Sequence, residues 1–272
     1  MLPTIDRTSV QRGPGPHIVF VHGLEDTSVC WEPIISHLPA TMSISTLEMP
    51  WRAGTRYEWR GTCSSEWLRQ ALTLVTEPID VVVAHSFGGH AALEMCCSPT
   101  SFTSDIVLIC PLYWSRHFMP TWTAFDAARK EFERHIEAGL LTRLGPRRQL
   151  LPSAIVDGMI SRALDRVGPL SLMTVFDRMV SSRALPVENI HSRVLILAAE
   201  GDPTLPPKAA AHLSAAIKDC ELVMRPEFDH FCNIHHAQEL AARIAEFATG
   251  ETRTSPQPGP TSCPGEDHVT AQ

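Results

Sequence analysis

The sequence has no long apolar run, although hydrophobic residues make up 44% of its 272 residues. None of its apolar stretches approaches the roughly 18 residues that indicate a membrane-spanning helix. The first residues also lack the basic segment and the following apolar segment of a secretory signal. Because a disordered chain contains far fewer hydrophobic residues, these features predict a folded, soluble, cytoplasmic protein with no membrane partner.

The sequence also has no excess of positive charge and none of the common metal-binding motifs. Its formal net charge is -7 at pH 7, which argues against a nucleic acid as a general partner. Eight cysteines and thirteen histidines are present, but they form no C-x-x-C, H-x-H or H-E-x-x-H spacing. We therefore expect no metal, and we expect the cysteines to be reduced, buried thiols.

What the sequence does contain is an alternation of strand-like and helical segments. Strands are predicted near 17–21, 42–47, 81–83, 105–110, 193–198 and 221–224, with room for a short edge strand before residue 16. Helices are predicted near 31–38, 66–75, 207–217 and 235–248, and another follows Gly89. This alternation predicts a single α/β core with a mostly parallel sheet flanked by helices, and a functional site beyond the carboxyl ends of the strands.

Residues 111–188 interrupt the alternation. They contain no strand-like run, only helical segments near 125–138, 154–167 and 170–180 that are separated by Pro and Gly. The stretch is too long for one crossover connection, so we predict an inserted helical cap at 111–188 and a core formed by 1–110 and 189–249. The segment 250–272 is rich in Pro, Ser and Thr and is predicted to be a disordered tail.

A serine stands at the junction of a buried strand and a helix, in the stretch Ile79-Asp-Val-Val-Val-Ala-His-Ser-Phe-Gly-Gly-His90. The pattern resembles the G-x-S-x-G nucleophile elbow of the α/β-hydrolase family, with Ala84 in place of the first glycine. Small residues are required there because the turn is strained and the strand and helix backbones approach closely. The resemblance implies that Ser86 is a nucleophile. The alternative is an ordinary turn in which Ser86 caps the helix.

The resemblance also implies the order nucleophile, acid, histidine along the chain, because a serine hydroxyl needs a base and an orienting carboxylate. The loop 111–117 after one strand contains no carboxylate, whereas the loop after 193–198 contains the step Gly-Asp202-Pro. Asp202 is therefore the predicted acid, with Glu200 as the second choice. The competing interpretation of Asp202 is a solvated turn residue.

His230 is the predicted base, because it lies in the loop before the last helix, 28 residues after Asp202. It matches the family's G-x-x-H turn only at the histidine. His235 and His236 compete for the role but are expected to face solvent, and His230 could also be an exposed loop histidine. The resemblance further implies an oxyanion hole formed by the backbone N–H groups of Leu24 and Phe87. Leu24 follows the His22-Gly23 step, in which His22 has a structural role, and Phe87 follows the nucleophile.

Two other regions are candidates for substrate contacts. The loop 48–60 carries Trp51, Arg52 and Arg56, and either it is an ordinary surface loop or it recognises an anionic or planar group, such as a carboxylate, an enolate or a carrier phosphopantetheine. The cap begins with Tyr113, Trp114, Trp122 and Phe125, which form either the core of the cap or part of a pocket. An aromatic, Met-rich cap favours a hydrophobic acyl group.

A serine in the elbow, rather than an aspartate, indicates attack on an acyl carbon. We therefore predict a serine hydrolase that needs no cofactor and cleaves an ester or thioester of a fairly apolar small molecule, which can be carrier-bound. A lyase, eliminase or cyclase of natural-product metabolism on the same scaffold is the main alternative. A non-catalytic binding protein is a minor alternative, and it should lack one member of the predicted triad.

Overall fold

The computed structural model describes residues 4–52, 57–98 and 103–250. Seven strands form one sheet in the order β1-β3-β2-β4-β5-β6-β7. Their bounds are Asp6–Gln11 (β1), His17–Val21 (β2), Ser43–Glu48 (β3), Val81–His85 (β4), Asp105–Ile109 (β5), Val194–Ala199 (β6) and Cys220–Arg225 (β7). β1 pairs antiparallel with β3, and all other neighbours are parallel.

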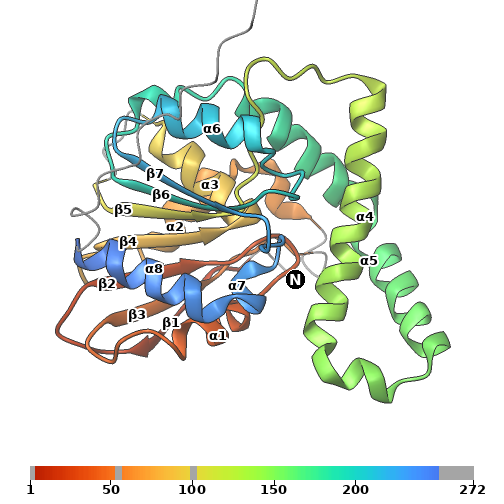
Figure 1. Ribbon diagram of the computed structural model, residues 1–272, viewed down its shortest axis with the longest axis horizontal. Helices are drawn as coiled ribbons and strands as arrows, with labels where there is room; N and C mark the ends of the chain where they lie inside the picture. Colours follow the sequence, from red (N-terminus) through yellow and green to blue (C-terminus); the bar gives the residue numbers. More distant parts are fainter. Residues whose placement is uncertain (1–3, 53–56, 99–102, 251–272) are drawn as a thin grey trace, which may run out of the picture.

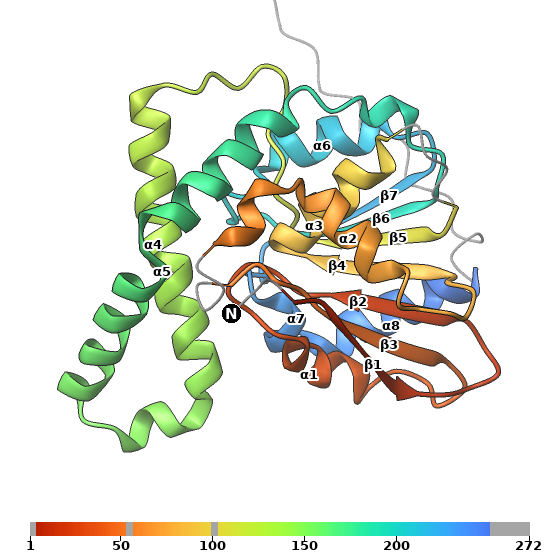
Figure 2. The same ribbon diagram turned by 180° about the vertical axis from the view of Figure 1, so that it is seen from behind.

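The central strands are apolar on both faces because helices cover both faces. In β4, for example, Val82 and Ala84 belong to one core cluster and Val81 and Val83 to the other. One face carries α2 (Ser64–Leu72), α3 (Ser86–Cys96) and α6 (Pro207–Ala216), as Figures 1 and 2 show. The other face carries α1 (Glu32–Ile35), α7 (Cys232–His235) and α8 (Ala237–Thr249). Short 3-10 helices lie at Ser28–Trp31 (η1) and Glu58–Gly61 (η3).

Between β5 and β6 the described chain contains helices and no strand. These are α4 (Trp122–Leu144), η4 (Gly145–Leu150), α5 (Ser153–Ser182) and η5 (Val187–Asn189). α4 and α5 lie together beyond one end of the sheet, to the right in Figure 1. α5 is kinked at Gly168, whose φ is +60°, because Pro169 lacks the N–H that a continuous helix needs at this point.

The structure confirms the predicted fold class, a mostly parallel sheet flanked by helices. Some boundaries differ from the sequence-based ones: the predicted helix at 125–138 spans the longer range of α4, and the predicted helices at 154–167 and 170–180 are two arms of the kinked α5. The last predicted helix is divided at His236 into α7 and α8. None of the helices in the described ranges is long and apolar enough to cross a membrane. The tail predicted at 250–272 lies outside the described residues, apart from Gly250.

Candidate active site

Ser86 is the first residue of α3 and directly follows β4, so its backbone makes a sharp turn with a φ of +53°. Two glycines allow this turn to pack. A Cβ atom at Gly88 would lie 2.5 Å from the carbonyl oxygen of His22, and one at Gly89 would lie 3.1 Å from Pro111. Neither position has room for a larger residue. The small residues of the elbow are therefore required by the close approach of α3 to the loops after β2 and β5.

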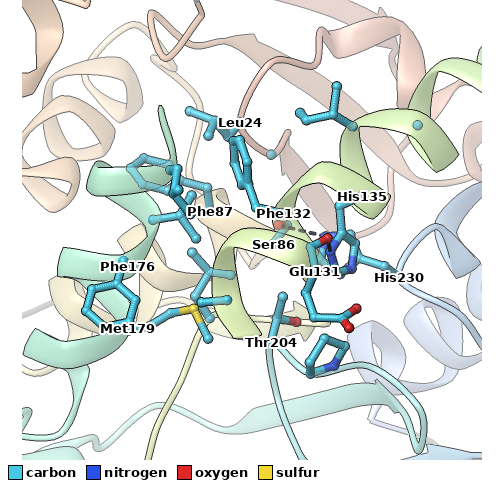
Figure 3. A pocket seen from close by; sticks show the side chains of 18 of the residues that line it. Leu24, Ser86, Phe87, Glu131, Phe132, His135, Phe176, Met179, Thr204 and His230 are labelled. Carbon is cyan, nitrogen blue, oxygen red and sulfur yellow. Dashed lines mark hydrogen bonds between the residues drawn. The ribbon is translucent and has the colours of Figure 1, made fainter. Parts of the chain in front are cut away.

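Three side chains from three different strand ends form one hydrogen-bonded chain. The Oγ atom of Ser86 lies 3.0 Å from Nε2 of His230, and Nδ1 of His230 lies 2.7 Å from Oδ2 of Asp202. Figure 3 shows Ser86 and His230 joined at the base of the pocket. Because a carboxylate only accepts hydrogen bonds, Nδ1 of His230 carries the proton, and Nε2 is free to accept the hydroxyl proton of Ser86.

Asp202 is buried and held in its ionised form. Burial alone would raise the pKa of Asp202, but His230 and the contact with His135 outweigh burial and hold it well below its usual range. The backbone N–H of Thr204 also donates to Oδ1 of Asp202, over 2.9 Å. The carboxylate is therefore available as an orienting acceptor for His230 at neutral pH.

His85, the residue before Ser86, supports the loop that carries His230. Its Nε2 atom lies 2.8 Å from the carbonyl oxygen of His230 and therefore donates a hydrogen bond to it. Burial, and to a lesser degree the electrostatic effect of the neighbouring His230, lowers the pKa of His85 to about 4, so this ring is neutral at neutral pH. The sequence analysis did not assign a role to His85, although its position beside the nucleophile is a usable signal.

The loop after β2 is held in place by His22, which is completely buried. Its Nδ1–H donates to the carbonyl oxygen of Gly23 over 2.7 Å, and its Nε2 accepts from the backbone N–H of Met49 over 2.9 Å. This neutral form agrees with the lowering of the pKa of His22 by burial. The loop brings Leu24 to the cavity that also contains Ser86 and Phe87. The N–H of Phe87 belongs to the first turn of α3, where backbone N–H groups lack intrahelical partners.

A cavity of about 310 Å³ opens above Ser86 and His230, between the sheet and the cap. Almost half of its lining residues come from α4 and the second arm of α5. The apolar part of the wall includes Leu112, Trp114, Phe118, Phe132, Phe176 and Met179. Charged groups, among them Glu25, Asp26, Glu131 and Arg143, line the remainder. The cavity is thus suited to a small molecule with an apolar portion.

The sequence profile of the Alpha/beta hydrolase family matches residues 18–243. The chain belongs to this family. No curated protein matches the chain in sequence. Among solved structures, a protein from Acinetobacter baumannii that is provisionally assigned as a lipase has 16% identity and a TM-score of 0.69, and the match covers 91% of this chain and 88% of that one.

Two further solved α/β-hydrolase structures are similar. A hydrolase from Oleispira antarctica has 16% identity and a TM-score of 0.63, with 90% of this chain and 94% of that one covered. The enol-lactonase from Burkholderia xenovorans has 16% identity and a TM-score of 0.59, with 91% and 97% covered. At 16% identity, these likenesses show a shared fold and nothing more specific.

In this α/β-hydrolase, none of the described residues of the loop after β3 lines the cavity. Trp51 is completely buried, donates from Nε1 to the carbonyl oxygen of His22 over 3.2 Å, and packs edge-on against Phe87. Arg52 forms an ion pair with Glu48 over 3.1 Å. Neither Trp51 nor Arg52 lines the cavity, so a contact between these side chains and a substrate stays a prediction without support from this cavity. Arg56 lies outside the described residues.

Of the four predicted aromatic contacts in the cap, the structure brings only Trp114 to the cavity wall. Tyr113 is buried but is not part of that wall. Phe125 packs behind the wall against Phe176, with ring centroids 4.9 Å apart, and Trp122 is 87% exposed. Phe125 shares a helix face with Phe132 and Ile136, which line the cavity, but it lies two turns nearer the start of α4 and contacts Phe176 there instead. Trp122 is the first residue of α4 and lies in solvent.

The cavity-facing side of α4 is not predicted from the sequence. Its members recur at helical spacing and include Ala128, Glu131, Phe132, His135 and Gly139. A Cβ atom at residue 139 would lie 3.1 Å from the ring of Phe231, so a larger residue there would require that ring to shift. This spacing predicts that the five residues share one face of the helix, but the sequence does not indicate which face turns toward the core.

The competing acid and base candidates lie away from the hydrogen-bonded chain. Glu200 is exposed, and Nδ1 of the exposed His235 pairs with Asp229 over 2.7 Å. The ring of His236 packs against Phe228. Among all predicted candidates, the structure brings together Ser86, His230 and Asp202.

One group of side chains in the described ranges has the spacing of a metal site. A ligand atom of Cys110 lies within 4.8 Å of ligand atoms of Asp202 and His230. The contact with Cys232 and burial both raise the pKa of Cys110, which disfavours the thiolate that a metal requires. The other two residues already bond to each other, so the group is poorly suited to a cation. All cysteines in the described ranges are free thiols.

Proposed function

We propose that this α/β-hydrolase is a serine hydrolase that cleaves an ester or thioester of a fairly apolar small molecule. The observation that carries the proposal is the continuous hydrogen-bonded chain from Ser86 through His230 to Asp202, which opens directly into an apolar cavity. Such a chain is the arrangement by which a serine hydroxyl becomes a nucleophile at neutral pH.

The mechanism that we propose has two steps. Nε2 of His230 takes the proton of Ser86 as Oγ attacks the acyl carbon, and the N–H groups of Leu24 and Phe87 donate to the oxyanion that forms. His230 then gives the proton to the leaving alcohol or thiol, which departs and leaves an acyl-enzyme. In the second step, water loses a proton to His230 and attacks the acyl carbon. The bond to Oγ then breaks, the acid leaves, and His230 returns the proton to Oγ of Ser86. No cofactor takes part in this scheme.

The chemistry of the cavity supports an apolar acyl group. Trp114, Phe176 and Met179 all line the cavity, and the ring of Trp114 packs against that of Phe176 with centroids 5.6 Å apart. Large apolar side chains favour a hydrophobic substrate over a sugar. The elimination or cyclisation alternative rested on the loop 48–60. Because the described residues of that loop lie outside the cavity wall, hydrolysis is the function that we propose.

A fluorophosphonate probe tests the proposal directly. We expect covalent labelling of the wild-type protein at Ser86, no labelling of Ser86→Ala, and labelling of His230→Ala that is slower by about a thousandfold or more, because the base is lost. His117→Ala, which changes a surface histidine outside the cavity, is the matched control and should label at the wild-type rate. The absence of an adduct at Ser86, or equal rates for His230→Ala and wild type, would contradict the mechanism.

A further inference from the structure

A second histidine contacts the acid of the candidate triad, and it comes from the cap. His135 projects from α4 toward Asp202, with its Nε2 atom 3.7 Å from Oδ1 of the carboxylate. Its ring also packs edge-on against the ring of His230, with centroids 4.4 Å apart. Figure 3 shows the two rings side by side, with Glu131 nearby. The carboxylate thus has one histidine on each of its two oxygens, and only one of these rings touches Ser86.

The two nitrogens of His135 both face groups that can only accept hydrogen bonds. Nδ1 lies 2.8 Å from the carbonyl oxygen of Glu131, one helical turn earlier, and therefore carries a proton. If the ring were neutral, Nε2 would direct its lone pair at the carboxylate of Asp202, which is unfavourable. Only the imidazolium form, with a proton on each nitrogen, suits both neighbours. Because the side chain of Asp202 is 1% exposed, its negative charge also needs a compensating partner.

We propose that His135 is a positioning residue which, as an imidazolium, holds cap helix α4 against Asp202 and so fixes the acid that orients His230. The proposal deepens the proposed function and rests on it for its catalytic meaning. The ion pair itself, however, is a statement about charge and geometry and can be tested without any measurement of activity.

His135 stands in a wall between two spaces. On one side is the substrate cavity, and on the other is a groove of about 280 Å³ behind the triad. Pro203 and Phe231 belong to the same wall. A side chain in this wall has limited contact with water, and that of His135 is 20% exposed. Its attraction to Asp202 is therefore screened much less than that of a surface pair.

The charged and titratable groups around His135 come from two helices and two loops. Glu131 and Arg134 lie on α4 itself, and Arg134 is engaged with Glu131. Asp202 comes from the loop after β6, and Asp229 and His230 come from the loop after β7. His235, on α7, pairs with Asp229 across the groove. The nearest opposite charge for His135 is the carboxylate of Asp202.

The shift in the pKa of His135 agrees with this arrangement. Burial alone would lower the pKa, but Asp202 and the carbonyl and carboxylate of Glu131 outweigh burial, and the pKa is raised above 6.5. A group whose pKa is higher in the folded state stabilises that state fully below the unfolded pKa, and this stabilisation is lost as pH rises through the folded pKa. The ion pair therefore strengthens folding in mildly acidic solution and weakens at alkaline pH.

Thermal unfolding of wild type and His135→Gln across pH tests the proposal. At about pH 6 we expect the variant to have a Tm lower by about 3 °C or more, because a partly buried pair is lost. The difference should shrink as the pH rises through the pKa of His135, since the wild-type ring then loses its charge. His235→Gln removes a histidine from a more exposed carboxylate pair and serves as the control, with a smaller difference across the range. A Tm difference that does not change with pH would overturn the proposal.

Two further measurements keep the test decisive. In an Asp202→Asn background, His135→Gln should no longer show its pH-dependent effect, because the carboxylate partner is absent. If His135→Gln fails to fold, an NMR titration of the wild-type histidine rings replaces it: no ring near Asp202 that titrates above 6.5 would overturn the proposal. These outcomes are separate from fluorophosphonate labelling, so a protein that shows the pH-dependent pair but no labelling contradicts only the proposed function.

Discussion

The four non-glycine residues with positive φ in the described chain all lie at or beside the candidate site. Ser86 is the candidate nucleophile, and Glu25 lines the cavity. Cys110 contributes to the group that contains Asp202, and the hydroxyl of Tyr57 bonds to Glu25. Such backbone conformations cost of the order of 1–3 kcal/mol each and persist only where surrounding contacts enforce them. The strain is therefore concentrated where side chains must be aimed into the cavity.

At this scale the elbow glycines provide a sharp test. Gly88→Ala should lower the free energy of unfolding by more than about 2 kcal/mol, because its Cβ would lie 2.5 Å from the carbonyl oxygen of His22 and the backbone there cannot retreat. Gly158→Ala, inside α5, has no atom within 4 Å of the added Cβ and is the matched control. The control should be neutral or more stable by up to about 1 kcal/mol. Urea denaturation measures both, and equal effects would contradict the packing argument.

A tyrosine from the loop after β3 contacts the cap helix α5 at its kink. The hydroxyl of Tyr57 lies 2.5 Å from the carbonyl oxygen of Val167, just before the kink at Gly168. The same hydroxyl lies 3.1 Å from Oε1 of Glu25. Within α5, the hydroxyl of Ser171 also donates to the carbonyl oxygen of Val167, over 3.2 Å. Tyr57 adds a partner from outside the helix at the kink and lies next to the loop that carries Leu24.

Tyr57→Phe should therefore reduce the free energy of unfolding by about 1–2 kcal/mol, because the single hydroxyl with which Tyr57 donates at the kink is lost. Tyr113→Phe changes the only other tyrosine in the sequence and serves as the control, with an expected change within about 0.5 kcal/mol. Chemical denaturation at neutral pH gives both values. If the two variants lose equal stability, the tie at the kink is not the cause.

The second arm of α5 forms part of the apolar wall, which makes a prediction about substrate length. Phe176→Ala enlarges the cavity, so kcat/KM for a longer acyl ester relative to a shorter one should rise about tenfold. Met173, one turn earlier on the same helix, is 52% exposed and is not part of the wall, so Met173→Ala should leave the ratio unchanged. A series of p-nitrophenyl esters measures the ratio. An unchanged ratio for Phe176→Ala would exclude this cavity as the acyl site.

At the scale of the whole molecule, one carboxylate joins three helices. Glu94 on α3 accepts from Ser64 and from the backbone of Ser65, both at the start of α2, and pairs with Arg178 on α5 over 3.7 Å. Burial would raise the pKa of Glu94. The hydrogen bonds from Cys63, Ser64 and Ser65 and the electrostatic effect of His90 outweigh burial and lower the pKa. A group with a lowered folded pKa stabilises the protein above its unfolded pKa, and this contribution disappears as pH falls through the folded value.

Glu94→Gln should accordingly cost about 1–2 kcal/mol of unfolding free energy at neutral pH, because a partly buried charge leaves its donors without a carboxylate. The cost should diminish below about pH 4.5, because the stabilisation that the ionised carboxylate of Glu94 gives to the wild-type fold decreases there. Glu133→Gln, an exposed carboxylate on α4, is the control and should change stability by less than about 0.5 kcal/mol. Denaturation curves at several pH values decide, and a cost that persists unchanged in acid would contradict the assignment.

Local patterns in the sequence were enough to predict the sheet, its flanking helices and the three members of the candidate triad. A valine run followed by Ser86 and two glycines allows few backbone conformations, and Asp202 and His230 lie in loops that follow strands. In a parallel sheet the carboxyl ends of all strands meet at one edge, so these loops converge. Strand order and chain order therefore carry most of the information about the site.

The tertiary structure alone decided which side chains surround the reacting groups. It turned the face of α4 that carries His135 toward Asp202 and left Trp122 exposed, and it buried Trp51 beneath Phe87. Helical periodicity defines a face but not the direction in which that face points, because the direction depends on packing between elements distant in sequence. Elements set by local sequence were therefore predictable, whereas contacts made between the cap and the core were not.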